Sequence, residues 1–169
     1  MKEDLRKSNK LFGAGDAFIA TALFAMAIFL LMISAGNCDQ LTPLVTLLEK
    51  AIPGIYRYAQ ASTGTCGVGA MHSVFWILIL PAATITAPVY STRTSKEVTY
   101  GGIIFVMIIE TVFLFILFNG TDQGHGKFSR MMRGSEFESY IANLILLLLP
   151  PIFLYVIASA IKSRSKINN

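Results

Sequence analysis

The residues with the clearest capacity for chemistry in this chain are two cysteines and one acidic residue in an apolar stretch. Cys38 and Cys66 are the only cysteines, and both belong to one segment between apolar stretches. In an oxidising compartment they can form a structural disulfide, which is the pairing we predict. Redox exchange needs an activated cysteine, typically in a Cys-x-x-Cys pair, and the sequence has none. Redox exchange and two free thiols remain the alternatives.

Glu110 is the acidic residue, and it lies near the middle of an apolar stretch. A carboxylate inside a membrane is costly and is a candidate proton relay, ion site or recognition point. One carboxylate without a basic partner or a second acid makes a poor transport path. We therefore favour a structural or recognition role. In the structural role the side chain is protonated or hydrogen-bonded and faces Thr84, Thr86, Asn143 or Tyr155 inside a helix bundle.

Positive charge recurs every third residue at Lys127, Arg130 and Arg133. On a helix these three residues would form one stripe, suited to anionic lipid headgroups or to an acidic partner. A solvated basic turn is the alternative, because Glu136 and Glu138 follow closely and dilute the charge.

The two histidines, His72 and His125, are isolated in the sequence. Neither has a His, Cys or Asp partner at the spacing of metal ligands. The sequence also lacks a Ser/His/Asp arrangement, paired carboxylates and a phosphate-binding loop. We therefore expect no metal, no cofactor and no enzymatic activity.

Four apolar segments must position these residues, and they lie at about 17–35, 71–90, 101–118 and 140–161. Each is long enough to cross a hydrocarbon core as a helix, which takes about 20 residues. Only 14% of the residues are charged and the mean hydropathy is +0.60. These values exclude most soluble enzymes. They predict an all-α protein, in which residues 1–169 form a single four-helix transmembrane bundle.

Orientation follows from the density of Lys and Arg beside each span. That density is highest in the two tails and in the short connector 91–100, so we expect both termini in the cytoplasm. The longer loops, 36–70 and 119–139, then face outward. Within the first of them, apolar residues recur at helical spacing until Pro53-Gly54, which predicts one or two amphipathic helices on the membrane surface. The net charge of +4 is then a matter of orientation and does not indicate nucleic acid as a partner.

Three stretches carry a family resemblance, and they stand in order on the predicted sides of the membrane. Arg6-Lys7-Ser8-Asn9 precedes the first span. Pro43-Leu44-Val45-Thr46 lies in the first outer loop and is followed by Tyr56. Gly126, Arg130 and Met131-Met132 lie in the second outer loop. Together they resemble the immunity proteins of A-type pore-forming colicins. That family has a Thr-Thr-Ala-Gly tract in its second outer loop, and this chain lacks it. The first outer loop of the family ends in Tyr-x-Lys-Thr-Ala-Pro, where this chain has Tyr56-Arg57-Tyr58-Ala59.

The resemblance implies a non-enzymatic inhibitor in the bacterial inner membrane. Such a protein binds the channel-forming domain of a pore-forming colicin and blocks opening of the pore. The residues that we expect to contact the toxin are Thr46, Tyr56, Glu110, Lys127, Arg130 and Arg133.

Two other classes of protein fit the same topology. The first is a plasmid exclusion protein of the inner membrane, which would share the size and the lack of catalytic residues. The second is a small transporter or a thiol-redox membrane enzyme, for which Glu110 and the cysteines are the only support. Membrane lipids are expected partners in every case.

Overall fold

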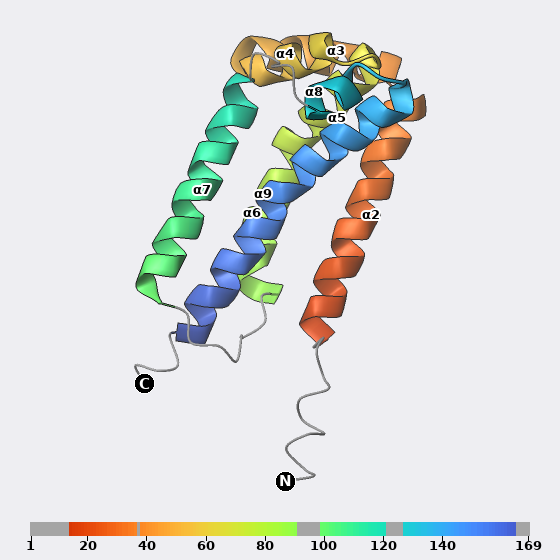
Figure 1. The fold of residues 1–169 in the computed structure, drawn as a ribbon. Helices are drawn as coiled ribbons and strands as arrows, with labels where there is room; N and C mark the ends of the chain where they lie inside the picture. Colours follow the sequence, from red (N-terminus) through yellow and green to blue (C-terminus); the bar gives the residue numbers. More distant parts are fainter. Residues whose placement is uncertain (1–13, 37, 91–98, 121–126, 165–169) are drawn as a thin grey trace.

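The computed structural model describes residues 14–36, 38–90, 99–120 and 127–164, with side chains for 21–33, 36, 39–89, 99–120 and 129–162. The described residues are helical, and none of them forms a strand (Figure 1). The helices are α2 (Ala14–Gly36), α3 (Cys38–Ala51), α4 (Pro53–Ala61), α5 (Thr65–Val74), η1 (Phe75–Ile79), α6 (Leu80–Tyr90), α7 (Tyr100–Asn119), α8 (Lys127–Met132) and α9 (Glu136–Arg164).

Three helical stretches are long and apolar enough to cross a membrane: Thr65–Val89, Tyr100–Asn119 and Glu136–Lys162. They coincide with the second, third and fourth predicted spans. The first predicted span, 17–35, falls within α2, a helix of 23 residues in which side chains are described for Thr21–Ile33 and Gly36. The described residues therefore form a helical protein with three helices long and apolar enough to span a membrane, and the first span stays a prediction.

Local sequence explains several helix ends. Ser135 and Glu138 form a capping box at the start of α9, in which each residue bonds the backbone N–H of the other, at 2.9 and 3.3 Å. Thr99 caps α7 by accepting a hydrogen bond from the backbone N–H of Gly102 at 3.2 Å. Gly120 ends α7 with a positive φ of 72°, a conformation that costs glycine little.

A π-helical turn interrupts the second span. The backbone N–H of Leu80 donates to the carbonyl of Phe75, five residues earlier, and Pro81 follows directly. Proline has no N–H, and its ring clashes with the carbonyl four residues before it in an α-helix. The wider turn relieves this conflict. The prolines of this span predict a distortion near its inner end, but the distortion lies near the middle of the helix.

Short helices cover one end of the bundle, which we call the capped end. There α3 and α4 lie across the ends of the long helices, and α8 packs beside them (Figure 1). Pro53 begins α4 directly after α3, so the predicted short helices with a break at Pro53-Gly54 are confirmed, and their place on a membrane surface stays a prediction. The opposite, open end holds the start of α2 and the end of α9.

The hydrophobic core lies between the long helices and the cap. It includes Phe75 from η1, Leu117 from α7 and Leu147 from α9, all without exposed surface. Of the three membrane-length stretches, α7 contributes least to this core. Only 11% of its most apolar part is buried, against 50% for Thr65–Val89. Its buried residues are Ile103, Glu110 and Leu117, which recur every seventh position and form one stripe. Helix α7 therefore contacts the bundle along a single line.

Candidate functional site: the capped end and the polar groups beneath it

A fully buried polar cluster lies directly beneath the cap. His72 from α5 and Asn143 from α9 have no exposed surface, and Nε2 of His72 lies 3.0 Å from Oδ1 of Asn143. The amide nitrogen of Asn143 donates to Oγ of Ser62 at 3.1 Å and to the carbonyl of Ser139 at 2.9 Å. The ring of Tyr58 from α4 stacks on His72 with centroids 4.8 Å apart. The cluster thus joins α4, α5 and α9.

The hydrogen bonds assign the tautomer of His72. A carbonyl oxygen only accepts, so Nδ2 of Asn143 must face Ser139 and Oδ1 must face His72. Nε2 of His72 therefore carries the hydrogen, and Nδ1 has no hydrogen-bond partner among the described residues. His72 therefore has a polar partner in the structure, although it belongs to no group of metal ligands among the described residues. No spacing in the sequence indicates this pair, because the two residues lie in different spans.

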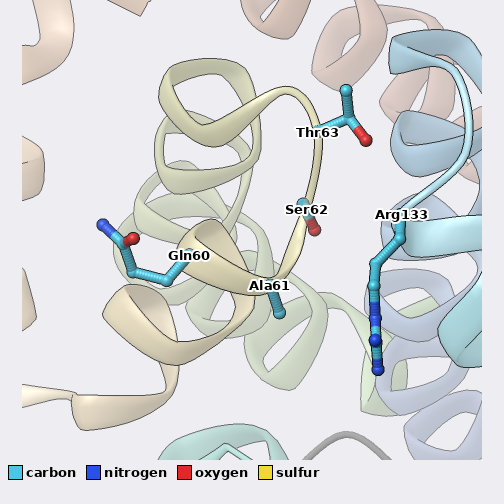
Figure 2. A pocket seen from close by; sticks show the side chains of 5 residues that line it. All are labelled: Gln60, Ala61, Ser62, Thr63 and Arg133. Atoms are coloured by element: carbon cyan, nitrogen blue, oxygen red, sulfur yellow. The ribbon is translucent and has the colours of Figure 1, made fainter. Parts of the chain in front are cut away.

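A cleft of about 380 Å³ opens at the capped end beside this cluster. Its lining comes from the last residues of α4, from the turn that follows and from the residue after α8: Gln60, Ala61, Ser62, Thr63 and Arg133. Figure 2 shows Arg133 on a different segment from the other four lining residues. Ser62 also accepts the bond from Asn143, so one hydroxyl connects the cleft to the buried cluster.

Two hydrogen bonds from Thr63 to backbone carbonyls hold the two segments around this cleft together. The backbone N–H of Thr63 donates to the carbonyl of Met132 at 3.1 Å. The hydroxyl of Thr63 donates to the carbonyl of Gly134 at 2.7 Å. The turn between α4 and α5 is therefore held against the turn between α8 and α9, and these two parts of the cap form one surface.

Five of the six predicted contact residues lie on the cap helices or directly after them. Thr46 on α3, Tyr56 on α4 and Arg130 on α8 are exposed. Arg133 directly follows α8, is exposed, and donates through Nη2 to Oγ of Ser129 at 2.8 Å. The hydroxyl of Thr46 donates to the carbonyl of Thr42 within its own helix at 2.9 Å. Arg130 lies on a helix, α8, as predicted for the basic stripe. The side chain of Lys127 is outside the described residues.

Glu110 lies apart from the cap, in the middle of α7, and is only 4% exposed. Neither of its carboxyl oxygens has a hydrogen-bond partner among the described residues. The expectation of a hydrogen bond to Thr84, Thr86, Asn143 or Tyr155 is therefore wrong. These groups bond elsewhere: Thr86 to Tyr155 at 2.9 Å, Thr84 to the carbonyl of Leu80 at 2.8 Å, and Asn143 to His72. Glu110 is therefore a buried acid that makes no hydrogen bond within the described part of the chain.

The predicted cysteine pair falls partly outside the described side chains. Sγ of Cys66 lies 3.9 Å from Oδ1 of Asp39, the residue next to Cys38. The start of α3 and the start of α5 are therefore close together. The side chain of Cys38 is not among those described, so the disulfide stays a prediction.

Metal-ligating groups do not gather in the described part of the chain, where no three His, Cys, Asp or Glu side chains come close enough to hold an ion. His125 lies outside that part. The three apolar helices fit a protein that crosses a membrane several times, with a polar cap at one end. Comparisons with protein-family models, with curated proteins and with solved structures find no match for this chain.

Proposed function

We propose that this chain is an immunity protein against a pore-forming colicin. In this proposal it crosses the bacterial inner membrane four times, with α2 as the first span and both termini in the cytoplasm. The capped end then faces the periplasm, the side from which the toxin arrives. The chain binds the channel-forming domain of the toxin and blocks opening of the pore, without catalysis or cofactor.

The observation that carries the proposal is the gathering, at one end of the bundle, of the resembling stretches from the two predicted outer loops. Pro43–Thr46 and Tyr56 come from the first of these loops and Gly126–Met132 from the second. Their described parts lie on α3, α4 and α8, which together make up the cap (Figure 1). The side chains of Thr46, Tyr56 and Arg130 are exposed there and available to a partner. A surface assembled from several loops suits recognition of one protein and rejection of its relatives.

The exposed sides of α7 support the second half of the proposal. A channel domain inserts apolar helices, and helices in lipid associate by close packing and a few interhelical hydrogen bonds. Helix α7 buries one stripe and leaves large side chains such as Phe105, Ile108 and Phe115 open to such packing. Glu110 lies on the buried stripe and has no hydrogen-bond partner among the described residues. In this proposal a polar group of the toxin bonds to it only after α7 moves away from the bundle, and the bond then relieves a buried unpaired acid.

The test is potassium efflux from sensitive cells that express this chain and are challenged with a panel of pore-forming colicins. We expect efflux to be blocked for one or two toxins and unchanged for the others. A matched strain should express the chain with α3 and α4 exchanged for the corresponding region of another immunity protein. This exchange should change which toxin is blocked.

Undiminished efflux for every toxin, with the protein present in the inner membrane, would contradict the proposal. The plasmid exclusion protein would then become the leading alternative, and conjugation frequency into the same cells would test it. An unchanged range of protection after the exchange would contradict only the role of the cap.

A further inference from the structure

An apolar groove of about 510 Å³ lies between α6 and α9 near the open end, far from the cap. Its walls are formed by the last turns of α6 and by the last third of α9. The residues that define it are Ala87, Pro88, Leu154, Ala158, Ile161 and Lys162.

The groove follows from residue size. Ala87 on α6 and Ala158 on α9 are small, so the two helices leave space between them. Leu154 and Ile161 extend its wall by one helical turn on either side of Ala158. Apart from Lys162 and one threonine, the lining offers no polar side chain. A flexible hydrocarbon chain suits such a groove, because it has no hydrogen-bonding group that would be left unpaired.

Lys162 places a positive charge at the end of this apolar groove. Its Nζ donates to the backbone carbonyl of Val89 at 3.4 Å, which holds the ammonium group beside the last residues of α6. Lysine commonly extends along apolar surface to reach the polar layer of a membrane. Arg164 and Lys166 follow in the sequence and add positive charge to the same tail.

We propose that the groove binds one acyl chain of an anionic phospholipid and that Lys162 binds the phosphate of its headgroup. Charge complementarity selects this occupant, because an apolar channel that ends in a cation matches a hydrocarbon chain that ends in an anion. Basic pockets between transmembrane helices are known to bind anionic lipid headgroups in this way. The inference needs only that the helices lie in a membrane, and it does not depend on the proposed immunity function.

Native mass spectrometry of the full chain, released from detergent micelles, tests the inference by lipid titration. Phosphatidylglycerol and phosphatidylcholine with identical acyl chains serve as probes. We expect one tightly bound phosphatidylglycerol. It should reach half-saturation at about fivefold lower lipid concentration than phosphatidylcholine, which is the effect of one lysine on the binding of an anionic lipid. Equal half-saturation for the two lipids would overturn the role of the charge.

Two variants separate the headgroup from the chain. Lys162→Gln should remove the preference for phosphatidylglycerol, while Lys50→Gln on α3 at the other end should keep it. Ala158→Phe should fill the groove and weaken both lipids, while Val156→Phe on the exposed side of α9 should not. A preference that survives Lys162→Gln, or binding that survives Ala158→Phe, would overturn the site.

Glycerol phosphate without acyl chains distinguishes a lipid from a free phosphate. We expect an excess of it to leave the bound phosphatidylglycerol in place. Displacement by glycerol phosphate would show a simple anion site and would overturn the lipid proposal.

Discussion

Asn143 of α9 and His72 of α5 are joined by a side-chain hydrogen bond of 3.0 Å, in a place where neither residue has exposed surface. The bond fastens two long helices together immediately below the cap. Because Asn143 also donates to Ser62, the same amide fixes the turn that lines the cleft. The shape of the cleft at the capped end therefore depends on a pair of residues that are themselves fully buried.

Replacing one member of this pair should destabilise the protein. Asn143→Leu leaves Nε2–H of His72 buried and unpaired, and we expect it to lower the free energy of unfolding by about 1 to 3 kcal/mol. Thermal unfolding in detergent measures this loss. The double variant His72→Phe with Asn143→Leu should recover much of it, because both polar partners are then gone. A double variant less stable than the single one would contradict the pairing.

Contact between α4 and α7 depends on the absence of a side chain at Gly54. A Cβ there would overlap the backbone carbonyl oxygen of Leu117 and lie 2.8 Å from that of Phe118. Gly54→Ala should therefore cost about 1 to 3 kcal/mol, as overpacking does. Gly101→Ala is the matched control, since nothing lies within 4 Å of its added Cβ. If the two variants unfold at the same temperature, this close approach is wrong.

Removing the acid at Glu110 should stabilise the fold. A buried polar group without a partner costs about 1 to 3 kcal/mol, so Glu110→Leu should raise the unfolding temperature. The exposed neighbour Thr111→Leu serves as the control. If Glu110 recognises the toxin, the same variant should protect cells less well although it is more stable. A lower unfolding temperature for Glu110→Leu would show that the carboxyl group has a stabilising partner.

Charge at α8 should matter for protection from the toxin. Arg130→Glu reverses an exposed charge on the proposed recognition surface. We expect about tenfold less toxin to be enough to overcome protection, which corresponds to a loss of about 1.4 kcal/mol in binding free energy. Lys50→Glu makes the same change on α3 outside the resembling stretches and should have a smaller effect. The toxin dilution that first causes potassium efflux is the measurement, at equal membrane levels of each variant. Equal effects of the two reversals would mean that the net charge of the protein, and not Arg130 itself, determines protection.

The cysteine pair can be tested chemically. In protein taken from the inner membrane and denatured, a maleimide polymer should modify Cys38 and Cys66 only after reduction. Gel mobility reports the number of polymers attached. The variant Cys66→Ser should gain one polymer without reduction. Wild-type protein that gains two polymers without a reductant would contradict the disulfide.

The long helices could be predicted because apolar stretches of membrane length leave few other structures. The start of the second span was harder to predict. Residues 62–69 are rich in Gly, Ser and Thr, which resembles a loop, yet α5 begins at Thr65. Small residues are required there because the cap helices cross closely: a Cβ on Gly69 would lie 3.1 Å from the side chain of Val45 on α3.

The polar contacts could not be predicted for a different reason. His72 and Asn143 lie in separate spans, and no spacing within either span indicates that they meet. Glu110 shows the reverse difficulty, since the polar residues predicted as its partners bond to other groups: Thr86 and Tyr155 to each other, Thr84 to a backbone carbonyl, and Asn143 to His72. Which polar groups pair inside a bundle depends on the rotation of each helix, and a single sequence determines that rotation only weakly.

The π-helical turn of the second span controls such a rotation. Buried residues recur every fourth position along this span, at Met71, Phe75, Ile79, Ala83 and Ala87. In a regular α-helix, positions four apart drift by about 40°, so this row would wind around the helix. The turn at Phe75–Ile79 uses more residues per revolution and keeps the row on one face. If the same residues were wound as a regular α-helix, Ala87 would turn away from α9, so the lower half of the bundle fits together because the π-helical turn takes up the additional residue.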